Sequence, residues 1–123
     1  MDHFRPLTLM LVVPVLALAL SACGGGSSDK DQITHISTIV GTTPGALCDH
    51  ASPRLLAGLG GVKECHNDAI NNPQPPLRDF RVNSVTVTGN SASASVTGQP
   101  GGTTTEHFVK VNGSWVFSAP GEK

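Results

Sequence analysis

The chain has 123 residues, with eight Lys and Arg against nine Asp and Glu, and a formal net charge of −1. A near-neutral chain without a cluster of basic residues lacks the electrostatic footprint of nucleic-acid-binding proteins, so we expect no nucleic-acid partner. Residues 31–118 are enough for one small domain, and residues 119–123 form a short tail. A domain of this size buries a limited core and gains from a covalent staple.

The first segment, residues 1–22, has the features of an export signal. A short start that contains Arg5 precedes an apolar run from Pro6 to Leu20. This run is shorter than the ~20 residues that a membrane-spanning helix needs, but it fits the apolar part of a signal peptide. We therefore expect residues 1–22 to be removed on export.

Small residues and a cysteine follow this run directly, in the string Leu20-Ser21-Ala22-Cys23. The string resembles the lipobox of bacterial lipoproteins, in which the peptide is cut before the cysteine and the thiol receives a diacylglycerol. The resemblance implies a lipid anchor (palmitate or a similar acyl chain) on Cys23 and a flexible tether over residues 23–30. It also implies attachment to the outer face of the cell membrane, or to a periplasmic membrane face in a Gram-negative host. The alternative is an ordinary secretory signal with a chance cysteine.

Two further cysteines, Cys48 and Cys65, remain for the exported domain. An even pair in an exported protein predicts a disulfide, which would close a loop of about 17 residues and add about 3 kcal/mol of stability. Because His50 and His66 lie near these cysteines in the sequence, a metal site is one alternative to the disulfide. Free or otherwise paired thiols are another. Zinc ligands are usually two to four residues apart, whereas adjacent Cys65 and His66 would point in different directions on a helix. We expect no metal and no other cofactor.

The N-terminal half of the domain has a helical period. Ile33, Ile36 and Val40 recur at helical spacing after Asp31, which can cap the helix, and Gly41 is expected to end it. Further helical segments are predicted at 43–51, 52–57 and 62–71, where prolines open the first two. In the last of these, we expect the following residues to face the core: Val62, Cys65, Ala69 and Ile70.

The C-terminal half alternates with the period of β-strands. Gly89-Asn90 and Asn112-Gly113 predict two hairpins, in which Val87 pairs with Ala92 and Phe108 with Phe117. A change of parity predicts a bulge near Asn83-Ser84. Helices followed by an antiparallel meander predict an α+β domain.

The last hairpin has apolar residues on both faces. Val109 and Val116 share one face, and Phe108, Trp115 and Phe117 share the other. The pattern does not say which face packs on the helices. A curved sheet that buries one face and lines a cavity with the other would use both.

The helical segments and the last hairpin together suggest a family. The matching features are residues 33–40, the strings Thr43-Pro44-Gly45-Ala46-Leu47-Cys48 and Ser52-Pro53, Cys65, and the string from Val109 to Val116. The chain resembles small exported lipoproteins of the actinobacterial type with the NTF2-like (nuclear transport factor 2-like, cystatin-like cone) fold. The resemblance implies short N-terminal helices on a curved antiparallel sheet, cysteines that join the helical segments, and a tryptophan that closes the last hairpin.

Two kinds of function remain open, and the expected lipid anchor, the two apolar faces of the last hairpin and the lack of a catalytic set favour the first. The favoured hypothesis is a non-catalytic domain, monomeric or homodimeric, that binds a small apolar ligand or a protein of the cell envelope. Its candidate binding residues are Asp49, His50, His66, Phe108, Trp115 and Phe117.

The alternative is an enzyme of the isomerase or cyclase type built around Asp49 and the nearby histidines. Some NTF2-like proteins are such enzymes, with a carboxylate or a His–Asp pair in the cone and a hydrogen-bond donor for the developing oxyanion. This chain has no tyrosine to serve as a phenolic donor, and we expect no catalytic residue. Glu106 is expected to be an exposed residue in a cross-strand pair.

Overall fold

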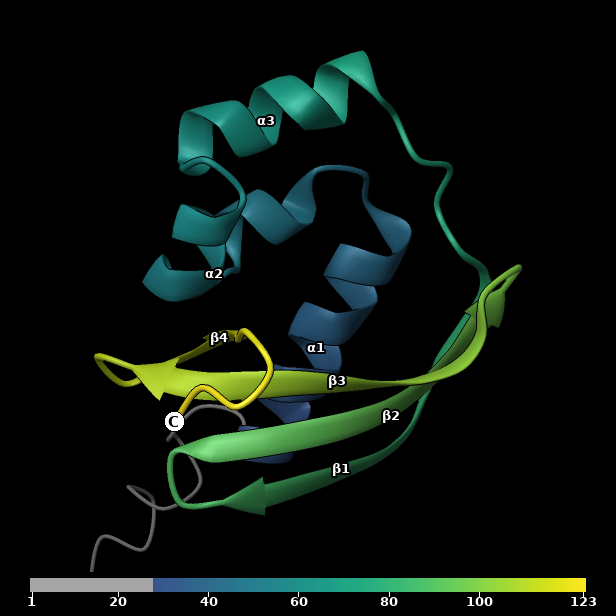
Figure 1. The fold of residues 1–123 in the computed structure, drawn as a ribbon. Helices are drawn as coiled ribbons and strands as arrows, with labels where there is room; N and C mark the ends of the chain where they lie inside the picture. Colours follow the sequence, from purple (N-terminus) through teal and green to yellow (C-terminus); the bar gives the residue numbers. More distant parts are fainter. Residues whose placement is uncertain (1–27) are drawn as a thin grey trace, which may run out of the picture.

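The structure, a computed structural model, describes residues 28–123. Short helices pack on a curved four-stranded antiparallel sheet, which is the predicted α+β arrangement and is consistent with an NTF2-like cone (Figure 1). The elements are α1 (Asp29–Thr42), the 3₁₀ helix η2 (Ala46–Asp49), α2 (Pro53–Gly58), α3 (Val62–Asn71), β1 (Arg78–Thr88), β2 (Ser91–Gln99), β3 (Gly102–Val111) and β4 (Ser114–Phe117). The expected signal peptide and the lipid on Cys23 lie outside the described residues.

The first helix begins earlier than predicted. The hydroxyl of Ser28 accepts a hydrogen bond from the backbone N–H of Asp31 at 3.2 Å, so Ser28 is the cap and the prediction of Asp31 is wrong. In a typical helix N-cap, the side-chain oxygen accepts a hydrogen bond from the backbone N–H two or three residues later. Asp29 and Lys30, which were assigned to the tether, are therefore part of the folded domain.

The same helix also continues past Gly41, which was expected to end it. A Cβ atom at Gly41 would lie 2.6 Å from Cε2 of Phe80, so the missing side chain allows β1 to approach the helix closely. The helix ends one residue later, where the N–H of Thr43 donates to the carbonyl of Ile39. Gly41 is thus a packing position and not a stop signal.

The sheet has the order β1-β2-β3-β4, with the predicted register in both hairpins. Val87 pairs with Ala92 across the first hairpin, and Phe108 pairs with Phe117 across the second. A register shift between Val82 and Ser84 confirms the predicted bulge. The turn residues Asn112 and Gly113 both have positive φ angles, 50° and 80°, as a two-residue hairpin turn requires.

The face of the sheet that carries Phe108, Trp115 and Phe117 is the one that packs on the helices. It forms the core with Ile33 and Ile36 of α1, and small alanines on β2 let the helix lie close. The rings of Phe108 and Phe117 are 4.6 Å apart between centroids, a favourable distance for an aromatic pair. The sequence did not show which face of the last hairpin packs on the helices. In the structure, α1 covers the face with Phe108, Trp115 and Phe117.

The segment after η2 covers the edge of β4. Ala51 forms a parallel bridge with Phe117, whose N–H donates to the carbonyl of His50 at 2.7 Å. A disulfide between Cys48 and Cys65 then joins η2 to α3, which confirms the predicted pairing. The bridge between Ala51 and Phe117 protects the edge of β4, which would otherwise expose unpaired backbone groups.

The third helix lies at the outside of the helical layer, far from the sheet (Figure 1). Its bounds agree with the predicted residues 62–71, and Cys65 is buried as predicted, but two of the other predicted core positions are exposed. Val62 and Ile70 are 51% and 75% exposed, and Cys65 is the buried residue of this helix. Because the disulfide holds α3 to η2, the helix does not need a wide apolar contact with the sheet.

The C-terminal tail is fixed to the domain by Glu122. Its carboxylate Oε2 accepts hydrogen bonds from the hydroxyl of Ser52 at 2.7 Å and from the N–H of Ala119 at 2.8 Å. Ser52 is fully buried and also caps α2. Over residues 28–123, none of the helices has the length and apolar character needed to span a membrane.

Candidate functional site

A hollow of about 500 Å³ lies at the end of the domain where α1 finishes. This volume lies within the range of small-molecule sites, roughly 300–1,000 Å³. The lining residues are Val40, Gly41, Pro44, Gly45, Leu47, Gln74, Pro75, Pro76, Leu77, Pro100, Gly101 and Glu106. Most of them present apolar side chains or backbone, so the hollow suits an apolar molecule.

Local sequence explains how the wall of this hollow forms. Prolines after α3 cannot continue a helix, and the segment from Pro73 to Pro76 has no regular secondary structure and leads from α3 to β1 (Figure 1). The N–H of Leu77 then donates to the carbonyl of Gly41 at 3.0 Å and fixes the segment against the end of α1. The turn between β2 and β3, which contains Pro100, supplies another part of the wall.

Glu106 provides the carboxylate of this hollow. It lies on β3 opposite Ala94 of β2, a residue that is 1% exposed, and so on the face of the sheet that α1 covers. The hydroxyl of Ser37, which is fully buried on α1, donates to Oε1 of Glu106 at 2.5 Å. Burial raises the pKa of the Glu106 carboxyl above its ordinary value, and the hydrogen bond from Ser37 partly offsets this rise.

The prediction that Glu106 is an exposed cross-strand residue is therefore wrong. A signal was present in the sequence, because Glu106 precedes Phe108 by two residues and must share its face of the strand. The face itself could not be assigned from the sequence, since both faces of the last hairpin are apolar. Once Phe108 is known to face α1, Glu106 must lie on the same covered face of β3.

The expected cluster of Asp49, His50 and His66 lines a second hollow of about 400 Å³ beside the disulfide. Nε2 of His66 lies 3.1 Å from Oδ1 of Asp49, while His50 lines the same hollow. The side chains of Asp49 and His66 are 62% and 43% exposed, respectively. Water screens so exposed a pair, which contributes little to stability.

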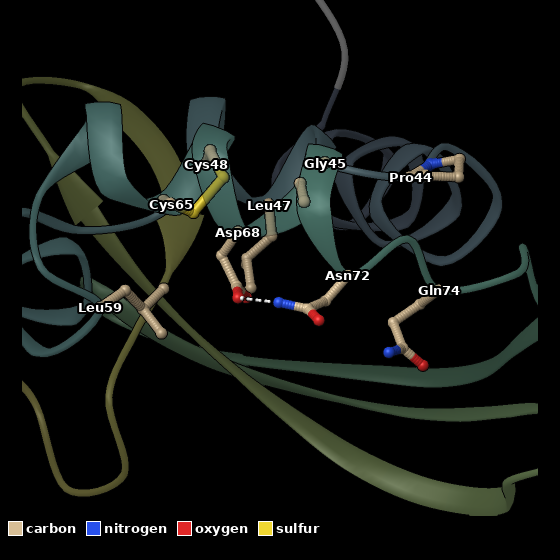
Figure 2. A pocket seen from close by; sticks show the side chains of 10 residues that line it. Pro44, Gly45, Leu47, Cys48, Leu59, Cys65, Asp68, Asn72 and Gln74 are labelled. Atoms are coloured by element: carbon tan, nitrogen blue, oxygen red, sulfur yellow. Dashed lines mark hydrogen bonds between the residues drawn. A yellow bond between two sulfur atoms is a disulfide. The ribbon is translucent and has the colours of Figure 1, made fainter.

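A third, smaller hollow borders the Cys48–Cys65 disulfide and is shown in Figure 2. Its volume of about 190 Å³ is below the range of ordinary small-molecule sites. The carboxylate of Asp68 accepts a hydrogen bond from the side-chain amide of Asn72 at 2.9 Å, one turn along α3. This hydrogen bond joins two of the polar side chains that line the hollow, and the small volume leaves little room for a ligand.

The aromatic residues that were expected to line a binding surface are part of the core. Phe108 and Trp115 are 1% and 2% exposed, and Phe117 is also buried. Phe108 also lines a hollow of about 270 Å³ together with Ala92, His107 and residues of the C-terminal tail. The role of the aromatic rings in the structure is to hold the helix on the sheet.

The described residues 28–123 contain no group of three or more His, Cys, Asp or Glu side chains placed to hold a metal ion. Cys48 and Cys65 are joined to each other, and their neighbouring histidines lie apart from Glu106 and its hollow. The structure thus pairs Asp49 with His66, places His50 in the same hollow, and pairs Ser37 with Glu106.

Comparisons with known proteins give little beyond this geometry. No protein-family model matches the sequence, and no curated protein matches it at a significant level. Among solved structures, a Campylobacter jejuni protein with the provisional name NTF2-like transpeptidase superposes with a TM-score of 0.41. The two sequences are 11% identical, and the match covers 72% of this chain and 95% of that chain.

Proposed function

We propose that this chain is an exported, lipid-anchored protein whose domain binds a small apolar ligand in the hollow at the end of α1. The observation that carries the ligand-binding proposal is the hollow itself. It has about 500 Å³ of space and apolar walls, with the half-buried carboxylate of Glu106 among them. A few polar groups among apolar walls are typical of sites that orient a ligand.

The lipid anchor is supported by the sequence, through the apolar run that ends at Leu20 and the small residues before Cys23. In this proposal the lipid on Cys23 holds the protein at the outer face of a membrane. The folded domain begins at Asp29, so only a short segment separates it from the anchor. The ligand would be captured close to the membrane surface.

Ligand binding is tested with the neutral fluorescent probe N-phenyl-1-naphthylamine, whose emission rises in an apolar site. We expect the wild-type chain to bind it and the Gly101→Leu variant to lose most of this binding. Gly101 lines the hollow and has no positive φ, and the nearest atom to a Cβ there would be the backbone oxygen of Gly98, at 4.0 Å. Gly58→Leu is the matched control, because Gly58 also has free space but lies outside the hollow.

Equal binding by both glycine variants would contradict the assignment of this hollow.

The anchor is tested separately, by growing bacteria that express the whole chain with labelled palmitate. We expect label and membrane fractionation for the wild type, and the loss of both in Cys23→Ala. A labelled Cys23→Ala chain, or an unlabelled wild type, would contradict the lipid anchor.

A further inference from the structure

The hollow at the end of α1 has an unbalanced charge. Among the described residues that line it, Glu106 is the one ionisable side chain. The elements around it contribute Ser37 from α1, Ala94 from β2 and Pro100 from the β2–β3 turn, none of which carries charge. The described ion pairs, His66–Asp49 and Lys110–Asp29, do not involve it.

The hydrogen bond from Ser37 leaves most of the acceptor capacity of Glu106 without a partner in the described part of the protein. A carboxylate has two oxygens and about four lone-pair sites, and Ser37 donates to Oε1 alone. A half-buried carboxylate without a cation is costly, which is why burial raises the pKa of Glu106. A ligand that brought a positive N–H group to the carboxylate would remove this cost.

The remaining walls define the other part of such a ligand. Val40, Leu47 and Leu77 present aliphatic side chains, and four prolines also line the hollow. We infer that the hollow selects apolar molecules that carry a single primary ammonium group, with the ammonium on Glu106 and the apolar part against these walls. This inference rests on the proposed ligand-binding function and names its ligand class.

The test uses two rigid probes of matched shape, adamantane-1-methylamine and adamantane-1-methanol. Their affinities are measured by calorimetry on the whole processed chain in phosphatidylcholine nanodiscs, with empty nanodiscs as the blank. At pH 7.5 we expect the amine to bind about tenfold more tightly than the alcohol, which corresponds to about 1.4 kcal/mol. In Glu106→Gln the preference should fall to less than about twofold, whereas in Glu64→Gln, an exposed position on α3, it should be unchanged.

Each result decides a different point. Equal affinities for amine and alcohol in the wild type would overturn the ammonium inference and leave the ligand-binding function standing. An amine preference that survives in Glu106→Gln would also overturn it, because the selectivity would arise elsewhere. If neither adamantane probe nor N-phenyl-1-naphthylamine bound, the proposed function would fail together with the inference. Circular dichroism of each variant shows that it is folded.

Discussion

The carboxylate of Asp29 accepts a hydrogen bond from the indole Nε1 of Trp115 at 2.9 Å and so joins the first turn of α1 to the last hairpin. Nζ of Lys110 lies 3.2 Å from the same oxygen and 5.4 Å from the centroid of the Trp115 ring. The hydrogen bond from Trp115, and then that from Lys110, hold the pKa of Asp29 below its ordinary value. This contact fixes the first turn of α1 against β3 and β4.

The first prediction concerns the charge of Asp29. A carboxyl with a lowered folded-state pKa stabilises the fold above its unfolded pKa, and this stability is lost as the pH falls through the folded pKa. We therefore expect Asp29→Asn to lower the Tm at pH 7, with a difference from wild type that shrinks as the solution is acidified below about pH 4. Thermal unfolding followed by the emission of Trp115, the single tryptophan, measures it.

The matched control is Asp31→Asn, in the same turn of α1 and exposed. Both variants weaken the favourable interaction of an acidic residue with the helix N-terminus. Only Asp29→Asn also removes the charge beside Trp115 and Lys110. Equal losses of Tm in the two variants would show that the contact with Trp115 contributes nothing of its own.

The second prediction concerns the disulfide. Cys48 and Cys65 are separated by 17 positions, and closing a loop of this length contributes about 3 kcal/mol in the chain-entropy model. The double variant Cys48→Ser/Cys65→Ser should lose about this much free energy of unfolding, measured by urea denaturation. Wild-type protein that reacts with iodoacetamide at both positions without a reductant would contradict the pairing.

The parts of the fold that sequence predicted correctly depend on local patterns. The registers of both hairpins follow from two-residue turns such as Asn112-Gly113 and from the alternation of side chains. The disulfide was predicted from the two cysteines, Cys48 and Cys65, that remain once Cys23 is assigned to the expected lipid anchor. In each case the information lies within a short segment or in a count.

The errors depend on contacts between distant segments. The sequence pattern predicts a helix end at Gly41, but the ring of Phe80, far along the chain, leaves no space for a side chain at this position. Val62 and Ile70 fit the apolar face of α3, but that helix packs through Cys65 and leaves both exposed. Glu106 was misplaced for the same reason, because the buried face of its strand is chosen by α1.

The third prediction tests the packing role of Gly41. Alanine is a better helix former than glycine by about 1 kcal/mol, so Gly41→Ala would stabilise an isolated helix. Here its Cβ would lie 2.6 Å from Cε2 of Phe80, and overpacking typically costs about 1–3 kcal/mol. We therefore expect Gly41→Ala to lower the free energy of unfolding by about 1 kcal/mol after both terms.

Gly58→Ala provides the matched control for Gly41→Ala. Gly58 is the last residue of α2, has no positive φ, and a Cβ there would meet nothing within 4 Å. The control should be neutral or slightly stabilising in the same urea denaturation. A Gly41→Ala protein with the same free energy of unfolding as the wild type would mean that Phe80 moves aside without cost. Gly41 would then have no packing role.

The last prediction concerns the stability of Glu106→Gln without any ligand. Because burial raises the folded-state pKa of Glu106, its ionised form costs stability at pH values above that pKa, and the cost vanishes below the unfolded pKa. Glutamine keeps an oxygen that can accept the hydrogen bond from Ser37 but carries no charge. We expect Glu106→Gln to raise the Tm at pH 7.5, on the order of 2 °C because partial exposure screens the charge, and to leave it unchanged near pH 4. Glu64→Gln, at an exposed position, should give the same small effect at both pH values. A Tm that falls equally at both pH values in Glu106→Gln would instead mean that the geometry of the Ser37 hydrogen bond, and not the buried charge, dominates at this position.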